Sequence, residues 1–351
     1  MSQKYDVTAL RAFAAHLFQH VGLDADKARV TADILVEGDL LGHTTHGLAL
    51  MPLYLDAASS GAMLGTGEPE VLAQTPVVET WDGKYLPGPW LVMRAAELAS
   101  KRAAEFGISA VSIRRSCHIG CLAAYLQPFA ERGQMLILAS SDPSVASVAP
   151  FGGTKRIYTP NPLAAGWPSP GGPVMFDVSM SITTNGMTGR MRAEGRQFDH
   201  PYLLDADGVP SRDPNVFFTN PPGSLQPLGG SEAGHKGYAL GLWLEALTSG
   251  LSGHGRADAP TAWGASVLVQ VIDPARFGGS DAFLREAGWM ESAIHENPPG
   301  PSGMPVRLPG ERGLALRDIA LREGVALHPS LPAMLAERAA KAGIAAPMPL
   351  G

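Results

Sequence analysis

The spacing of apolar residues predicts helices at both ends of the chain. Four segments repeat apolar positions every three to four residues, as an amphipathic helix does: residues 7–21, 25–41, 45–59 and 329–343. Asp6 and Asp24 stand directly before the first two segments, where a carboxylate can cap the free N–H groups of a helix. The pattern predicts a helical N-terminal lobe and a last helix that is free to join it.

The pattern changes to short apolar runs in the middle of the chain. Strands are predicted at 77–81, 107–113, 134–141 and 265–273, and helices at 88–106, 119–133 and 235–251. Residues 140–235 are rich in Gly, Pro and Ser, and such loop-rich stretches often carry the site of a compact enzyme. We therefore expect an α/β protein with a helical lobe over 1–72, rejoined by helices at about 312–345, and an α/β body over 73–311.

Composition indicates hidden surface and excludes some partners. Only 17% of the 351 residues are charged, below the roughly 25% of an average soluble protein, so part of the surface is expected to lie in a homo-oligomer interface. The net charge of −6 comes without basic runs, which argues against nucleic acid as a partner.

The longest apolar stretch, 238–253, contains Glu245 and is too short to cross a membrane. With two cysteines and no signal-peptide pattern, we expect a cytoplasmic protein without a disulfide framework.

Two histidines, His43 and His46, lie three residues apart at the start of the third predicted helix. A zinc site of this kind usually needs a third ligand and a nearby glutamate, and the HExxH pattern is absent. The alternatives are two structural histidines, or one histidine that exchanges a proton near neutral pH while Thr45 holds its ring. We predict no metal here.

The segment "CHIGC" places His118 between Cys117 and Cys121. A zinc site of two cysteine pairs is excluded, because the chain has no other cysteine. Both cysteines are interpreted as small core residues. His118 follows a predicted strand and precedes a predicted helix, which is a suitable place to contact an anionic group.

No nucleotide-binding fingerprint occurs in the chain. A Rossmann turn needs a glycine-rich segment between a strand and a helix, and neither "GTGEPE" nor "PLGGSEAGHKG" meets that requirement. The segment 230–240 places His235 and Lys236 before a predicted helix, as a phosphate site would, although a plain helix start has the same pattern. Asn161 and Asp177 lie in apolar surroundings and would each need a specific polar partner.

Several segments occur in an order that resembles the type-2 malate/L-lactate dehydrogenase family. They are "THGLALMPLY", "SCHIGCLAAY", "SSDP", "VAPFGG", "NPLA", "FDVSMS", "LLDADGVPSRDP" and "LGGSEAGHKGYALGLWLEALTSGLSG". The resemblance runs from about residue 5 to about residue 345. It implies a non-Rossmann fold with a mixed, largely antiparallel sheet, and a helical domain built from both chain ends. It also implies NADH or NADPH as cofactor and a homodimer with an active site between the domains.

The resemblance also implies roles for individual residues. Thr45-His46-Gly47 matches the family's Ser-His-Gly, which makes His46 the proton donor. His118 matches a second active-site histidine, and Asp205 matches an aspartate that can orient the catalytic histidine. The other matching residues lie near substrate or cofactor in the family: Ser141, Asn161, Asp177, Val178, Ser179, Lys236, Gly237, Arg307, Pro309 and Gly310.

The chain departs from the family pattern on the substrate side. Leu50 stands where the family commonly has an arginine that grips the substrate carboxylate, and Met187 replaces a lysine. A bidentate arginine supplies energy and orientation that leucine does not. Arg190 or Arg192 can replace that clamp, or the substrate can be less anionic.

These observations predict an NAD(P)-dependent oxidoreductase of a small molecule. Its reaction is hydride transfer between the nicotinamide and a 2-oxo acid or 2-hydroxy acid. The alternative is reduction of a cyclic or N-alkyl imine. The replacement of the family's arginine by Leu50 weakens this alternative less than it weakens the 2-oxo acid hypothesis. A protein of the same fold that binds ligands without turnover is a further alternative, as is a zinc hydrolase.

Overall fold

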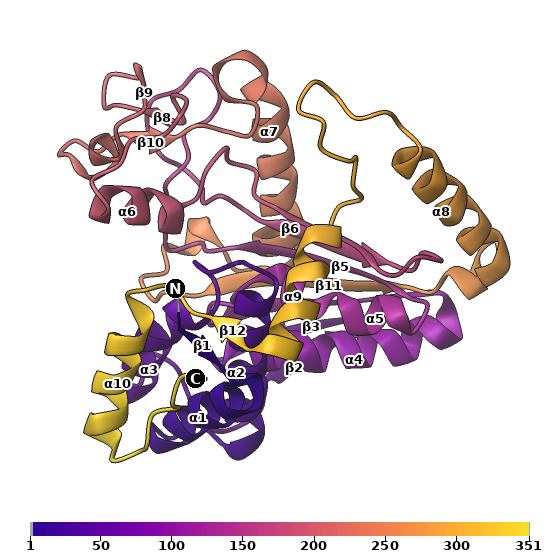
Figure 1. The fold of residues 1–351 in the computed structure, drawn as a ribbon, viewed down its shortest axis with the longest axis horizontal. Coiled ribbons are helices and arrows are strands. Elements are labelled where there is room, and N and C mark those ends of the chain that lie inside the picture. The colour runs from indigo at the N-terminus through magenta and orange to yellow at the C-terminus, as the bar shows by residue number, and fades with distance from the viewer. Residues whose placement is uncertain (1–2, 351) are drawn as a thin grey trace.

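A seven-stranded mixed sheet forms the centre of the molecule (Figure 1). The computed structural model describes residues 3–350. In sheet order the strands are β2 (Glu70–Gln74), β3 (Val78–Asp82), β4 (Ile108–Ser116), β11 (Ala265–Ile272), β5 (Met135–Ser141), β6 (Leu163–Trp167) and β7 (Val174–Val178). Strands β3 and β4 are parallel, and every other neighbouring pair is antiparallel. The predicted mixed, largely antiparallel sheet is confirmed.

Helices cover both faces of this sheet. Helix α4 (Gly88–Phe106) packs against β4 and β11, and α5 (Gln127–Glu131) lies on the same side (Figure 1). The opposite face carries α7 (Gly230–Glu245), which continues as a π-helical turn over Ala246–Gly250. Because both faces are covered, β11 is buried along most of its length, and its sequence is an apolar run without alternation.

The two ends of the chain meet in one helical lobe (Figure 1). It contains α1 (Val7–His20), α2 (Ala25–Leu40), α3 (Met51–Ser59), α9 (Glu311–Glu323) and α10 (Leu331–Ala342). Strands β1 (Lys4–Tyr5) and β12 (Val325–Ala326) pair antiparallel at this junction. One apolar core joins residues from both chain ends, such as Leu10, Leu35, Leu331 and Leu335. The residue boundaries of the two expected domains stay a prediction.

The remaining elements lie around the sheet. A small sheet of β8 (Leu203–Leu204), β9 (Pro210–Ser211) and β10 (Ser224–Leu225) stands beside α6 (Asn185–Ala193), and α8 (Ser280–His295) lies at the far edge (Figure 1). Short 3₁₀ helices span Leu48–Leu50, Leu122–Tyr125, Pro214–Phe218, Arg256–Asp258 and Pro274–Arg276. Within residues 3–350, no helix has the length and apolar character needed to cross a membrane.

Three predicted helices differ from the observed ones. The predicted helix 45–59 starts only at Leu48, so His43 and His46 lie in the turn before it. The segment 119–133 divides into a 3₁₀ turn and the short α5. Helix α7 starts at Gly230, which places His235 and Lys236 inside the helix and not before it. Its glycines make this possible: a Cβ on Gly237 would lie 2.3 Å from the carbonyl oxygen of Leu228.

The caps of the first two helices also differ from each other. Asp6 caps α1 as predicted, because its side chain accepts a hydrogen bond from the backbone N–H of Ala9. Asp24 precedes α2 but makes no side-chain cap. Its carboxylate accepts a hydrogen bond from Lys27 instead (2.8 Å).

Candidate active site

A cavity of about 780 Å³ brings together eight of the site residues that the sequence singled out. Its wall is built by the turn after α2, the start of the Leu122–Tyr125 turn, the ends of β5 and β7, and the start of α6. The predicted site residues on this wall are Thr45, His46, Leu50, His118, Ser141, Asn161, Asp177 and Ser179. This volume is in the range of small-molecule sites.

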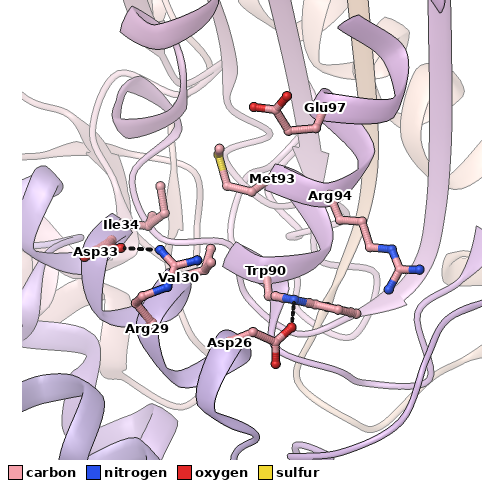
Figure 2. Close-up of a pocket in the computed structure, with 9 residues that line it drawn as sticks. All are labelled: Asp26, Arg29, Val30, Asp33, Ile34, Trp90, Met93, Arg94 and Glu97. Carbon is pink, nitrogen blue, oxygen red and sulfur yellow. Dashed lines mark hydrogen bonds and ion pairs between the residues drawn. The ribbon is translucent and has the colours of Figure 1, made fainter. Parts of the chain in front are cut away.

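The second hollow is shallower and carries paired charges (Figure 2). It lies between α2 and α4 and has a volume of about 480 Å³. The indole N–H of Trp90 donates to Asp26 (2.7 Å), and Arg29 pairs with Asp33 (3.2 Å). Because these polar groups are paired with one another, this hollow offers a ligand fewer free polar groups than the larger cavity does.

The turn that carries His46 is fixed from below by a buried carboxylate. Asp39, near the end of α2, is 5% exposed and accepts a hydrogen bond from the backbone N–H of Leu48 (2.8 Å). Gly47 makes this contact possible, since a Cβ there would lie 2.5 Å from the carboxyl group of Asp39. Burial raises the pKa of Asp39 to about 7, although the Leu48 N–H and the positive charge of Arg190 act against the shift.

The His46 ring is held by its neighbour in sequence. The hydroxyl of Thr45 lies 2.9 Å from Nδ1, as expected from the sequence. Burial lowers the pKa of His46, while the negative charge of Asp177 acts in the opposite direction. A half-buried imidazole with a carboxylate nearby can accept and release a proton.

The ring of His118 lies beside that of His46 in the cavity lining, with ring centroids 6.0 Å apart. The backbone N–H of Gly120 donates to its Nδ1 (3.1 Å), so the neutral ring carries its proton on Nε2. The hydroxyl of Tyr54 lies 2.8 Å from the same nitrogen and donates to the His118 carbonyl oxygen (2.9 Å). Trp263 stacks on the ring with centroids 5.2 Å apart. Burial, followed by the neighbouring His46, lowers the pKa of His118 to about 3.

A polar network closes one wall of the cavity. The hydroxyl of Ser141 and the amide of Asn161 both donate to Oε1 of Glu245, at 2.7 and 2.9 Å. Arg256 reaches the same carboxylate oxygen (2.9 Å) and so neutralises it. Asn161 is fully buried and also donates to the Gly241 carbonyl oxygen (3.1 Å), which confirms the expectation that it has specific partners.

Asp177 also lines the cavity and lies near the end of β7. Its Oδ2 accepts the backbone N–H of Ala123 (3.0 Å) and lies 3.6 Å from Sγ of Cys121. Burial raises the pKa of Cys121 well above its usual range, and the charge of Asp177 adds to the effect. One ring nitrogen of His43 lies within 4.8 Å of both groups.

The cavity wall is acidic. Its described residues include the carboxylates of Asp142 and Asp177 but neither lysine nor arginine. Arg190, from α6, turns toward Thr44, donating to its hydroxyl (2.9 Å) and its carbonyl oxygen (3.0 Å). Arg192 lies over the ring of Phe218. Neither arginine lines the cavity in the single chain, although both were expected to bind substrate.

Other predicted residues lie away from the cavity in this chain. The carboxylate of Asp205 accepts the backbone N–H groups of Asp207 (3.0 Å) and Val209 (2.9 Å), so it stabilises a turn and does not contact His46. Residues absent from the cavity wall also include Val178, Lys236, Gly237, Arg307, Pro309 and Gly310. The loop 307–310 nevertheless packs on β7, where the Pro309 carbonyl oxygen accepts the N–H of Met175 (3.1 Å).

Sequence reasoning missed the residues that support the histidines. Asp39 and Trp263 lie outside the quoted motifs, and Tyr54 ends the motif "THGLALMPLY" but received no role from it. Glu245 offered a signal, because it is the one acid in an otherwise apolar stretch. That interruption was interpreted only as an argument against a membrane span.

Comparisons with known proteins agree on one family. The family model described as malate/L-lactate dehydrogenase matches residues 5–336. The L-lactate dehydrogenase of Cupriavidus necator is 30% identical, over 90% of this chain and 91% of its own length. The Δ¹-pyrroline-2-carboxylate/Δ¹-piperideine-2-carboxylate reductase of Pseudomonas putida is also 30% identical, over 91% of this chain and 92% of its own.

A solved structure has the same arrangement of elements. The malate dehydrogenase of Pyrococcus horikoshii superimposes with a TM-score of 0.87 at 26% identity, covering 98% of this chain and 97% of that one. Membership of one family therefore accounts for both the fold and the order of the motifs. The chain belongs to the malate/L-lactate dehydrogenase family and is an NAD(P)-dependent oxidoreductase.

Proposed function

We propose that the enzyme reduces the carbonyl carbon of a small 2-oxo acid, or oxidises the corresponding 2-hydroxy acid. The observation that carries the proposal is the pair of half-buried histidines, His46 and His118, which line one cavity with unequal affinities for a proton. A bound nicotinamide supplies or takes the hydride, and the protein supplies the proton and the orientation.

His46 is the proton donor in this proposal. Reduction of a carbonyl places negative charge on its oxygen, and a cationic imidazole neutralises that charge by giving up a proton. The charge of Asp177 favours the protonated form of His46 and lies on the same cavity wall. The hydroxyl of Thr45 orients the ring through Nδ1, which leaves Nε2 for the substrate.

His118 polarises the substrate without changing its own charge. With its pKa lowered to about 3, the ring stays neutral at physiological pH. Its Nδ1 accepts the N–H of Gly120, so the Nε2–H bond is the group that can donate to a carbonyl oxygen. Tyr54 and Trp263 hold the ring in place.

The residues of the cavity fit a nicotinamide cofactor. Oδ1 of Asn185 is buried and has no hydrogen-bond partner, so it can accept an N–H from a carboxamide group. Ser141 and Ser179 also line the cavity and carry hydroxyl groups. Lys236 and the loop 307–310 lie outside the cavity, where the charged phosphates of a dinucleotide would be solvated; we propose that these segments contact that part.

Imine reduction is the second candidate, and the charge of the cavity favours it. An iminium carbon is attached to a positively charged nitrogen, which the carboxylates of Asp142 and Asp177 stabilise. A 2-oxo acid carries a carboxylate, and the described wall offers it no lysine or arginine. The apolar side chain of Leu50 adds no polar contact to either substrate.

We also propose a homodimer in the cytoplasm. The glycine-rich face of α7 packs inward, whereas its outer face is apolar and exposed at Leu240 (42%), Leu242 (43%), Trp243 (52%) and nearby Leu251 (57%). A second copy related by a twofold axis would bury this face against itself. Light scattering after gel filtration tests this, with Trp243→Glu expected to yield monomers; a monomeric wild type would contradict the proposal. Both buried cysteines are free, in keeping with a reducing compartment.

Loss of reduced-nicotinamide absorbance tests the reaction, with NADH and NADPH in parallel. The substrates are pyruvate, oxaloacetate, longer 2-oxo acids, and cyclic imines with and without a carboxylate. We expect turnover with at least one of these. Cofactor binding without turnover of any of them would contradict both candidates and favour a ligand-binding role for this fold.

Leu50→Arg separates the two substrate classes. An arginine at this position adds a cation to the cavity wall, so the KM for 2-oxo acids should fall by roughly tenfold or more. The KM for imines without a carboxylate should not fall. Equal effects on both classes would refute the role assigned to this position.

A further inference from the structure

Three side chains of different chemistry meet at one wall of the catalytic cavity. A ring nitrogen of His43, Sγ of Cys121 and a carboxylate oxygen of Asp177 all lie within 4.8 Å of one another. They come from the turn after α2, the segment before the Leu122–Tyr125 turn and the end of β7. Although the sequence alone predicts no metal at His43, we propose that these residues bind one transition-metal ion of the zinc class, with a fourth coordination position that borders the cavity.

The spacing of the donors suits a tetrahedral ion. Zinc lies about 2.3 Å from a thiolate sulfur and about 2.0 Å from an oxygen or nitrogen, so donors around it are roughly 3.5 Å apart. The sulfur of Cys121 and Oδ2 of Asp177 are 3.6 Å apart. A ring nitrogen of His43 lies within 4.8 Å of both and completes the set of three donors.

Two of the three donors are held in place by the fold. Asp177 pairs with Ala164 across β6 and β7, and its carboxylate also accepts the N–H of Ala123 (3.0 Å). Cys121 approaches α2 closely because Gly38 has no side chain; a Cβ there would lie 3.3 Å from Cβ of Cys121. Hydrogen bonds that orient ligands from behind increase metal affinity.

The chemistry of the donors selects the ion. Sulfur and nitrogen ligands disfavour Mg²⁺ and Ca²⁺, which prefer oxygen, and favour Zn²⁺ or its spectroscopic substitute Co²⁺. On binding, the Cys121 thiol releases its proton to solvent as the metal–sulfur bond forms, and no electron is transferred. The three side chains alone carry a formal charge of −1. The site carries a formal charge of 0 once the divalent ion is bound and the thiol proton has left.

The ion would also supply a substrate contact that the cavity wall lacks. No lysine or arginine lines the described wall, and Leu50 cannot bind a carboxylate. An open metal position can coordinate one carboxylate oxygen of a 2-oxo acid. This second step rests on the proposed function, whereas the metal site itself does not.

Cobalt titration of the full-length protein tests the site. The protein is treated with EDTA, dialysed with a thiol-free reductant and titrated with Co²⁺. We expect one ion per chain, with a thiolate-to-cobalt charge-transfer band and visible bands of a tetrahedral ion. Zinc measured by mass spectrometry should reach the same stoichiometry.

Cys121→Ser should abolish the charge-transfer band, and His43→Asn and Asp177→Asn should each weaken binding by at least roughly tenfold. Cys117→Ser is the matched control, because Cys117 is equally buried but its sulfur contacts the carbonyl oxygen of Tyr85 (3.1 Å). A wild-type protein that is folded by circular dichroism but gives no band would overturn the proposal. A band that persists in Cys121→Ser would do the same.

Pyruvate added to the cobalt protein tests the substrate contact. We expect the visible bands to shift; unchanged bands would refute carboxylate coordination while the metal site stands. The turnover assay tests the proposed reaction, and the cobalt titration tests the metal site separately. Turnover without cobalt bands sinks the metal site alone, and cobalt bands without turnover sink the proposed reaction alone.

Discussion

Asp39→Asn should remove part of the pH dependence of stability. Asp39 is buried beneath the turn that carries His46, and burial raises its pKa to about 7. In the unfolded chain the same carboxyl group has a pKa of about 3.9. Between these two values the folded protein holds a proton that the unfolded chain has released. This contribution to stability is complete below about pH 4 and is lost as the pH rises through 7.

The size of the effect follows from the two pKa values. A separation of about three pH units corresponds to about 4 kcal/mol in the free energy of unfolding, at 1.36 kcal/mol for each unit. Asparagine has nearly the same shape and can accept the N–H of Leu48, but it does not titrate. The wild type should therefore lose up to about 4 kcal/mol relative to Asp39→Asn between pH 4 and pH 8.

Urea unfolding at several pH values measures this difference. Asp213→Asn is a control, because Asp213 also accepts a backbone N–H, from Asn215 (2.9 Å), at an exposed cap. The control should leave the pH dependence close to that of the wild type. Parallel curves for wild type and Asp39→Asn would refute the reasoning, since they would mean that Asp39 stays ionised when buried.

Three further predictions concern the histidines and their supports. His46→Asn should lower turnover by roughly 10²–10⁴-fold without changing the fold. Nicotinamide absorbance measures the turnover, and circular dichroism checks the fold. Unchanged turnover would show that His46 is not the proton donor. Gly47→Ala should cost about 1–3 kcal/mol in urea unfolding, because the new Cβ would meet the carboxyl group of Asp39; an unchanged midpoint would contradict this. Tyr54→Phe should destabilise the fold by about 1 kcal/mol and lower kcat more than it changes KM, because His118 loses a hydrogen bond, and wild-type kcat would refute that role.

Local sequence was informative where neighbouring residues decide the structure. Asp6 caps α1 because the cap contact spans only three residues. The apolar run at 265–273 predicted a strand, and β11 occupies Ala265–Ile272. The contact between Thr45 and His46 is also local, and it was predicted correctly.

Local sequence misled where packing overrides periodicity. The pattern predicted a helix from residue 45, but the buried carboxylate of Asp39 takes the N–H of Leu48 and holds the preceding residues in a turn. The pattern also predicted that the helix at 235–251 starts at His235, but α7 starts at Gly230. Its glycines have no side chains and so let the helix approach Leu228 and Tyr158. In both cases a contact outside the local segment outweighs the local preference.

The sequence by itself determined the family and the order of the motifs, and it singled out the two histidines that line one cavity. Only the tertiary structure decided which residues surround them. Tyr54 and His118 are 64 positions apart, Cys121 and Asp177 are 56 apart, and Ser141 and Glu245 are 104 apart. Periodicity and motifs report on residues that are near one another in the chain. Contacts over such separations form only when the sheet, its covering helices and the two chain ends pack together, because burial of the whole core fixes their positions.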